Sequence, residues 1–270
     1  MRFSVCVEMI YPELDFAARV LKVRNRGFSA VEFWAWTNKD LNALQALTRQ
    51  GLVVATFSGQ RKGSLLNPQD WDTYRGEVEA AIPVAKRLGC DRLMLLTQEL
   101  LPNGSGRPAP PQLSRAEQRA TIVRGLRGLA PIAEREKITL LLEPLNVLVD
   151  HPGYFLDSGR EGFAIVQEAG SPRVRLLYDI YHLEVMQRNS TDVLLSHLPL
   201  VGHIHIADVP GRHEPGTGTL DFYRILRAAG EKGYTGAVGF EFSPSAGSDE
   251  ALGRILELRD RLQKSGCAVE

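Results

Sequence analysis

Short apolar runs that resemble buried strands alternate with helical patterns eight times along this chain. The runs are rich in Val, Ile, Leu and Phe, as is typical of parallel strands buried on both faces. A strand–helix–strand unit returns the chain to the same end of the sheet, so the strands are expected to run parallel. The expected strands are Arg2–Glu8, Ala30–Trp34, Leu52–Phe57, Arg92–Thr97, Thr139–Leu145, Val174–Ile180, Gly202–Asp208 and Gly236–Phe242.

The helical patterns between these runs carry recognisable ends. Gly27 and Gly89 follow two of them, as C-terminal capping residues do, and Ser114 with Glu117 has the spacing of a capping box. Eight strand–helix units close a barrel, so we predict the α/β class and a single (β/α)8 (TIM) barrel domain over residues 1–270. The expected helices are Asp15–Arg26, Asn38–Gln50, Trp71–Leu88, Ser114–Glu136, Glu161–Ala169, Thr191–Leu198, Leu220–Ala229 and Asp249–Lys264.

The main competitor, a doubly wound open sheet, normally has a glycine-rich phosphate loop after its first strand, and this sequence has none there. The overall charge argues against nucleic-acid binding, because the 32 basic and 32 acidic residues cancel and phosphate neutralisation needs a basic excess. No apolar run approaches the roughly 18 residues of a membrane span. The N-terminus reads as a strand and not as a signal peptide.

Cys6, Cys90 and Cys267 are far apart and form no C-x-x-C motif. This spacing favours free thiols, which are typical of a reducing cytoplasm. We therefore expect a cytoplasmic protein that binds neither nucleic acid nor a membrane.

Four polar residues lie near the ends of consecutive apolar runs in the second half of the chain: Glu143, Asp179, His205 and Glu241. The carboxyl ends of barrel strands carry the functional residues, so we expect the four side chains to meet. A single acid at a strand end is commonly a helix cap or an ion-pair partner. Several buried carboxylates beside one imidazole favour a bound cation, because unpaired burial costs several kcal/mol for each.

One nitrogen and three oxygen ligands suit a divalent metal, with Mn²⁺ or Mg²⁺ preferred and Co²⁺ or Zn²⁺ as alternatives. His203 has the same strand parity as His205. Because His205 lies nearer the carboxyl end, we interpret His203 as a structural histidine deeper in the barrel. Arg212 follows in a glycine-containing loop, where the spacing alone fits a substrate-binding arginine and a solvated one equally well.

The first half of the chain offers fewer functional signals. Glu8, Glu32 and Trp34 end the first two expected strands, and an aromatic residue at such a position is more often a core plug than a substrate wall. Pro102–Gln112, rich in Gly and Pro, is expected to be a long loop on the same face of the barrel.

The segments LLLEPLNVLVDHPGYFL, YDIYH, GHIHIADVPGRHEPGTG and GAVGFEFSP resemble the hydroxypyruvate isomerase family, within the xylose isomerase-like barrel superfamily. The resemblance spans nearly the whole chain and begins at RFSVCVEM. It implies that Glu143 and Glu241 are metal ligands that also act as an acid/base pair, and that Asp179 and His205 are ligands. It further implies that His182 and Arg212, as in related ketose 3-epimerases, contact substrate oxygens.

The implied reaction converts hydroxypyruvate to tartronate semialdehyde through a metal-stabilised enediolate. Some hydroxypyruvate isomerases have Gln where this chain has His205, so a ketose 3-epimerase or a 2-oxo-tetronate isomerase remains an alternative. A lyase or dehydratase, or a non-catalytic sugar-acid binding protein, is a more distant one. Barrels of this group often form dimers or tetramers, which makes a homo-oligomer an expectation from resemblance.

An AP endonuclease on the same barrel is disfavoured. Its D-R-H motif would need Asp at Gly211, and its zinc ligands include histidines from the first half of the barrel. All six histidines of this chain lie at or after position 151.

Overall fold

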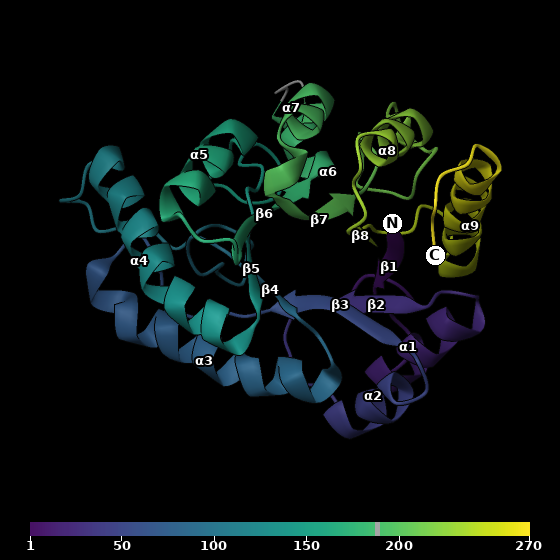
Figure 1. The fold of residues 1–270 in the computed structure, drawn as a ribbon, viewed down its shortest axis with the longest axis horizontal. Helices are drawn as coiled ribbons and strands as arrows, with labels where there is room; N and C mark the ends of the chain where they lie inside the picture. The colour runs from purple at the N-terminus through teal and green to yellow at the C-terminus, as the bar shows by residue number, and fades with distance from the viewer. Residues whose placement is uncertain (187–189) are drawn as a thin grey trace.

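The computed structural model describes residues 1–186 and 190–270. Within them, eight parallel strands form a closed barrel in sequence order, and the last strand pairs with the first (Figure 1). This architecture confirms the predicted (β/α)8 barrel. The strands are β1 Arg2–Cys6, β2 Ala30–Phe33, β3 Val53–Ser58, β4 Arg92–Leu95, β5 Thr139–Leu142, β6 Val174–Asp179, β7 Val201–Ile206 and β8 Ala237–Phe240.

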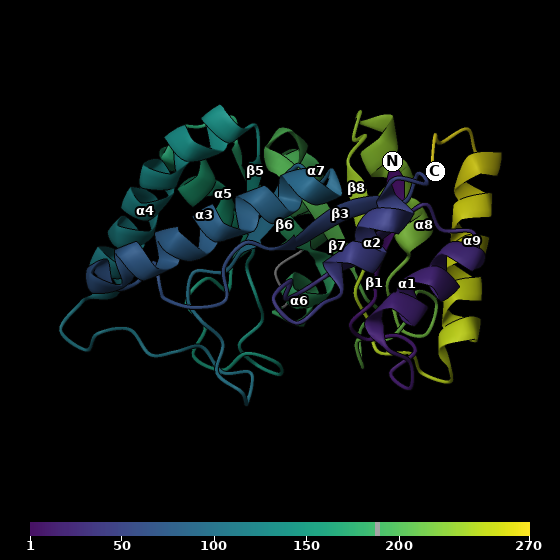
Figure 2. The same cartoon turned by 90° about the horizontal axis from the view of Figure 1, so that it is seen from below.

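The helices surround the strands (Figures 1 and 2). Their predicted ends are confirmed where a cap defines them: Gly89 ends α3 with a φ of 68°, and Ser114 and Glu117 form the capping box of α4. The α-helices are α1 Phe16–Asn25, α2 Leu41–Thr48, α3 Trp71–Leu88, α4 Arg115–Glu136, α5 Gly159–Ala169, α6 Ile180–Val185, α7 Ser190–Ser196, α8 Phe222–Glu231 and α9 Ser248–Lys264. Short 3-10 helices occur at η1 Pro68–Asp70 and η2 Leu198–Leu200.

Several expected strands were too long at their carboxyl ends. Ile180, expected in strand six, is the first residue of α6, a short helix that the sequence reading missed. The helix begins there because the Asp179 side chain caps it by accepting a hydrogen bond from the His182 amide at 3.1 Å. The apolar pattern misled because Leu145 and Phe242 remain buried beyond β5 and β8. Loops that pack onto the barrel mouth therefore prolong a strand-like pattern.

The inside of the barrel holds a small apolar cluster of Met94, Leu141 and Leu177, and Trp34 packs against it. Trp34 thus packs on the core while part of its side chain stays exposed. The chain ends lie side by side at the amino end of β1 (Figure 1), where the Phe3 amide donates to the Glu270 carbonyl at 2.9 Å. None of the helices described in residues 1–186 and 190–270 is both long enough and apolar enough to cross a membrane.

Candidate active site

The four predicted metal ligands meet at the carboxyl ends of β5 to β8. His205 Nδ1 faces three carboxylates, at 3.3 Å from Glu241 Oε2, 3.4 Å from Glu143 Oε1 and 3.9 Å from Asp179 Oδ2. All four side chains are buried. The structure therefore places one imidazole nitrogen and three carboxylates around a common point, as the sequence pattern predicted.

The barrel backbone fixes these positions. Asp179 and His205 are direct partners in the register of β6 and β7. Glu143 and Glu241 each lie one residue beyond a strand, and the Glu241 amide still donates to the Ile206 carbonyl at 3.2 Å. Asp179 has two tasks, because Oδ1 caps α6 while Oδ2 faces the cluster. The helix-cap role and the site role of this acid are therefore compatible.

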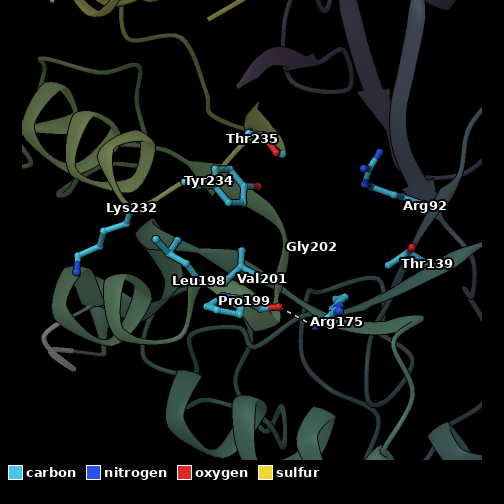
Figure 3. A pocket seen from close by; sticks show the side chains of 12 residues that line it. Arg92, Thr139, Arg175, Leu198, Pro199, Val201, Gly202, Lys232, Tyr234 and Thr235 are labelled. Atoms are coloured by element: carbon cyan, nitrogen blue, oxygen red, sulfur yellow. Dashed lines mark hydrogen bonds between the residues drawn. The ribbon is translucent and has the colours of Figure 1, made fainter. Parts of the chain in front are cut away.

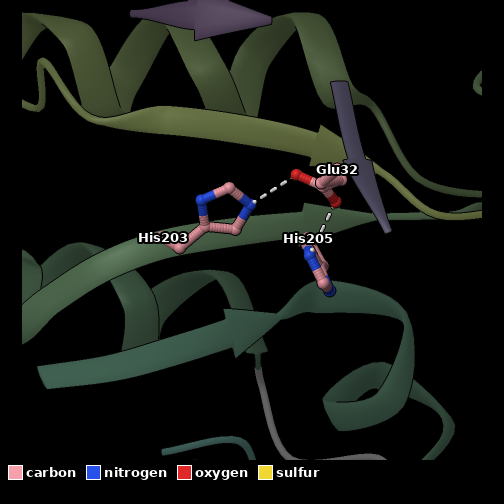
Figure 4. A group of neighbouring side chains, drawn as sticks. All are labelled: Glu32, His203 and His205. Atoms are coloured by element: carbon pink, nitrogen blue, oxygen red, sulfur yellow. Dashed lines mark ion pairs between the residues drawn. The ribbon is translucent and has the colours of Figure 1, made fainter. Parts of the chain in front are cut away.

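Glu32 on β2 is a further carboxylate at this site, to which the sequence reading gave no role. Its Oε1 lies 2.9 Å from His205 Nε2, and its Oε2 lies 3.0 Å from His203 Nε2 (Figure 4). All three side chains are fully buried. His203 lies deeper than His205, as expected, because it pairs with Leu177 in the strand register. An acid inside the apolar run AVEF was the available signal for Glu32.

The ionisation of these groups reflects their burial and their neighbours. Burial raises the pKa of Glu143 above its ordinary value and raises the pKa of Asp179 to about 7, although His205 opposes both shifts. Burial would lower the pKa of His205, but Glu32 and then Glu143 hold it well above 6.5. Burial would raise the pKa of Glu32, yet the two histidines outweigh it and hold that pKa below its ordinary value.

The cluster therefore retains protons when no other cation balances it. Across the part of the chain that the structure describes, neither ring nitrogen of His205 has a hydrogen bond of regular geometry, although Nε2 lies at ion-pair distance, 2.9 Å, from Glu32 Oε1. The three carboxylate neighbours of Nδ1 are hard oxygen donors, and divalent metals displace protons from such groups. This donor set fits a divalent metal.

His182 stands beside the cluster in the first turn of α6, with Nε2 3.7 Å from Asp179 Oδ2. Its Nδ1 faces the Asn146 side-chain nitrogen at 2.7 Å and the Asn146 amide at 3.3 Å. The Asn146 orientation is set because its Oδ1 accepts from the amides of residues 149 and 150. Burial, followed by the charge of Arg212, lowers the pKa of His182 well below 6.5. His182 is therefore a neutral imidazole with its proton on Nε2.

His182 can also be grouped with Glu143 and Asp179, since the three offer ligand atoms within 4.8 Å of one another. Its Nδ1, however, is already engaged by two donors from Asn146. Only Nε2 remains for a metal, and that nitrogen carries the proton. This geometry favours His182 as a hydrogen-bond donor.

Arg212 reaches into the site from the loop after β7. Its side chain is 15% exposed, and its guanidinium lies 2.6 Å from Glu241 Oε1 and 3.6 Å from Asp150 Oδ1. Burial would lower its pKa, but Glu241 and Asp179 hold the pKa above its ordinary value. Arg212 is thus a partly buried ion-pair partner of Glu241 and not a freely solvated loop arginine.

Asp208 organises the loop that carries Arg212. Its carboxylate accepts hydrogen bonds from four backbone amides, those of Val209, Gly216, Gly218 and Leu220. A Cβ at Gly218 would lie 2.5 Å from Asp208 Oδ1, so only glycine fits there. The Arg212 amide also donates to the Asp208 carbonyl at 3.1 Å, and Arg212 adopts a left-handed φ of 57°. The glycine-rich loop is therefore a rigid support that directs the arginine inward.

Comparison with known proteins places this architecture in a family. Residues 20–261 match the family model described as xylose isomerase-like TIM barrel. A putative hydroxypyruvate isomerase from Homo sapiens is 34% identical, over 97% of this chain and 96% of that protein. The hydroxypyruvate isomerase of Escherichia coli K12 is 30% identical, over 93% and 97%. A 2-oxo-tetronate isomerase from Cupriavidus necator is 31% identical, over 93% and 96%.

Solved structures show the same fold. A protein from Brucella melitensis, named AP endonuclease of family 2, superposes with a TM-score of 0.85 at 25% identity, over 95% of this chain and 98% of that one. The IolI protein, solved with a zinc atom, superposes with a TM-score of 0.75 at 17% identity, over 98% and 99%. The closed barrel, the family-model match and the curated relatives agree, and the chain belongs to the xylose isomerase-like TIM barrel family, among its hydroxypyruvate isomerase-like enzymes.

Proposed function

We propose that this enzyme is an aldose–ketose isomerase that converts a small hydroxy-keto acid, hydroxypyruvate, to tartronate semialdehyde. The observation that carries the proposal is the buried cluster of three carboxylates around His205 Nδ1, at the end of the barrel where catalytic sites are built. The relatives named hydroxypyruvate isomerase, at 30% and 34% identity, support this substrate class.

Glu143, Asp179, His205 and Glu241 would hold the divalent metal. When bound, such a metal supplies Lewis-acid stabilisation of negative charge that develops on substrate oxygens. The donors favour Mn²⁺ or Mg²⁺, and Co²⁺ or Zn²⁺ are alternatives. The IolI protein, which shares this barrel fold, was solved with a zinc atom, so the fold can carry a divalent metal.

Glu143 and Glu241 would also move the proton between the two adjacent carbons of the substrate. One carboxylate removes the proton from the hydroxyl-bearing carbon, and a carboxylate returns a proton to the neighbouring carbon, while the hydroxyl proton passes to the former carbonyl oxygen. Their surroundings differ, which suits two roles. Burial raises the pKa of Glu143 above its ordinary value, which favours the protonated form of this group. Glu241 is instead paired with the Arg212 guanidinium at 2.6 Å.

His182 and Arg212 would bind substrate oxygens. The neutral His182 ring points a proton on Nε2 towards the cluster and can donate it to a hydroxyl or carbonyl oxygen. Arg212 brings a partly buried positive charge that suits an enediolate oxygen or the substrate carboxylate. Asp150 lies 3.6 Å from Arg212 and limits where the guanidinium can turn.

The test is proton exchange in D2O, followed by NMR with Mg²⁺ as a diamagnetic metal. Hydroxypyruvate, 2-oxo-tetronate, fructose, tagatose and ribulose are compared with the wild-type enzyme and with Glu143→Gln. The expected result is metal-dependent deuterium uptake with hydroxypyruvate and a new aldehyde signal, both absent from the variant. Bound metal without exchange on any substrate would contradict the isomerase proposal.

Two alternatives keep specific support. The Cupriavidus necator relative at 31% identity favours 2-oxo-tetronate as substrate, and His205 in place of Gln favours a ketose 3-epimerase. Deuterium uptake with 2-oxo-tetronate alone would identify the first reaction. Uptake with only a stereochemical change at one ketose carbon would identify the second.

DNA repair remains disfavoured despite the Brucella melitensis structure, because this chain's histidines all lie at or after position 151. A single domain over residues 1–270, a cytoplasmic location and a homo-oligomer belong to the same proposal.

A further inference from the structure

The two ring nitrogens of His205 face different surroundings. Nδ1 points at Glu143, Asp179 and Glu241, the residues proposed above to share the metal with it. Nε2 points the opposite way, into the barrel, where Glu32 Oε1 lies at 2.9 Å (Figure 4). A neutral imidazole carries its single proton on one nitrogen and its lone pair on the other. The partner of Nε2 therefore decides whether Nδ1 is free to act as a ligand.

The Glu32 carboxylate is held on two further sides. Its second oxygen lies 3.0 Å from His203 Nε2. On β8 it rests against Gly239, where an added Cβ would lie 2.2 Å from Glu32 Oε1 and 2.6 Å from Oε2. Glu32 is 1% exposed, and both histidines are fully buried. The carboxylate is thus confined between two imidazoles and a glycine backbone, with little freedom to leave His205.

Glu32, His203 and His205 offer ligand atoms within 4.8 Å of one another and could be read as a second metal site. The contact distances argue against this reading. Glu32 already touches both Nε2 atoms at 2.9 and 3.0 Å, so an ion between them would have to push the three side chains apart. Close packing resists such a shift, because the Gly239 backbone lies so near the Glu32 carboxylate that not even a Cβ would fit between them.

We propose that Glu32 is the positioning residue of the metal site: by holding the proton of His205 on Nε2, it presents the Nδ1 lone pair to the metal. This inference rests on the proposed metal-dependent function. A carboxylate that accepts from the distal N–H of a histidine ligand fixes the ring and raises the basicity of the coordinating nitrogen. His203 and Gly239 act one step further out, because they hold the Glu32 carboxylate in place.

Glu32→Gln is the direct test, because it keeps the size of the side chain and removes the charge. Each histidine lies against a different oxygen of Glu32, so in the Gln side chain the NH2 group would face one of the two Nε2 atoms and could not accept its proton. We expect the dissociation constant for Mn²⁺ and Zn²⁺, measured by calorimetry, to rise about 10- to 100-fold. The KM for substrate at saturating metal should stay unchanged, since Glu32 lies behind His205.

Gly239→Ala tests the contact between Glu32 and His205 without changing an ionisable group. The added methyl would overlap the Glu32 carboxylate and displace it from His205. We expect weaker metal binding in the same direction as Glu32→Gln. Glu8→Gln is the matched control, because Glu8 is also a shielded acid just beyond a strand of the barrel. It pairs with Lys39 at 2.8 Å and is expected to leave metal affinity unchanged.

The wild-type enzyme loaded with Zn²⁺ gives a measurement that needs no variant to fold. Long-range ¹H–¹⁵N NMR should show His205 with its proton on Nε2, slow to exchange with water, and with Nδ1 bound to the metal. Zinc bound through Nε2 would overturn the inference. So would a second equivalent of bound zinc that His203→Asn removes, since Glu32 would then be a ligand itself.

The failure of this inference can be told apart from the failure of the proposed function. Unchanged metal affinity in folded Glu32→Gln and Gly239→Ala would contradict the positioning role alone. A wild-type enzyme that binds no divalent metal would contradict the proposed function and this inference together.

Discussion

The two ends of the barrel differ in how their charged side chains are placed. At the carboxyl end, Glu143, Asp179 and Glu241 are buried around His205, and each lies within 4 Å of its Nδ1. At the amino end, a cavity of about 370 Å³ lies among the starts of β4 to β8, lined in part by Arg92 and Arg175 (Figure 3). Both ends are polar, but only the carboxyl end concentrates charges of one sign out of contact with water.

At the amino end, each of these two arginines has its own hydrogen-bond or ion-pair partner. Arg175 donates to the Pro199 carbonyl at 2.7 Å (Figure 3) and to the Pro172 carbonyl at 3.1 Å. Arg92 pairs with its neighbour Asp91 at 2.6 Å, and both side chains are substantially exposed. Such exposed pairs contribute about 0–1 kcal/mol. The comparison shows that the fold tolerates charge at either end, but that the carboxyl end is costly unless a cation joins it.

The largest expected effect comes from the acid/base pair. Glu143→Gln and Glu241→Gln should each lower the turnover of hydroxypyruvate about 100- to 10,000-fold, because each removes a group that transfers a proton. The rates are measured by NMR at saturating Mg²⁺, and circular dichroism checks that the fold persists. Retention of most activity in either variant would show that the two-carboxylate mechanism is wrong.

Metal removal tests the charge balance itself. A free metal concentration of 100 times the dissociation constant should stabilise the folded protein by about 2.7 kcal/mol. The rise in Tm on adding Mg²⁺ or Mn²⁺ should be larger at pH 8 than at pH 5.5. Protons compete with the metal, since burial raises the pKa of Asp179 to about 7 and raises that of Glu143 as well.

The same shifts predict how the metal-free protein responds to pH. The pKa of Asp179 is higher in the folded state than in the unfolded state. Its stabilising contribution is therefore complete below the unfolded pKa, about 3.9, and is lost as pH rises through about 7. His205, with its raised pKa, acts in the same direction at higher pH. A Tm of the chelated protein that rises between pH 6 and pH 8 would contradict this picture.

His182→Ala should have an intermediate effect. Loss of a hydrogen bond to a charged substrate oxygen costs about 1.5–3 kcal/mol, which lowers kcat/KM about 10- to 100-fold. Metal affinity, measured separately by calorimetry, should change little because Nε2 carries a proton. An equal loss of bound metal would show that His182 is a ligand.

The smallest effect is expected at the amino end. Arg92→Ala should leave turnover unchanged and shift the free energy of unfolding by no more than about 1 kcal/mol, because its ion pair is exposed. Denaturant unfolding and the hydroxypyruvate assay together measure both quantities. A large loss of activity would show that the two ends of the barrel are coupled.

The sequence by itself determined the barrel and much of its active end. The alternation of strand and helix patterns is local, so it survives without any knowledge of packing, and it predicted all eight strands. The polar residues that end consecutive apolar runs, Glu143, Asp179, His205 and Glu241, could be found because parallel strands bring their carboxyl ends to one face.

Only the tertiary structure decided what each side chain touches. Glu32 meets His203 and His205 because barrel closure points side chains of β2 and β7 into the same interior, a relation that no local pattern carries. Arg212 reaches Glu241 because Asp208 holds its loop in a left-handed turn. Periodicity fixes which way a residue points along its own strand, whereas the partner of each nitrogen and oxygen depends on distances set by the whole barrel.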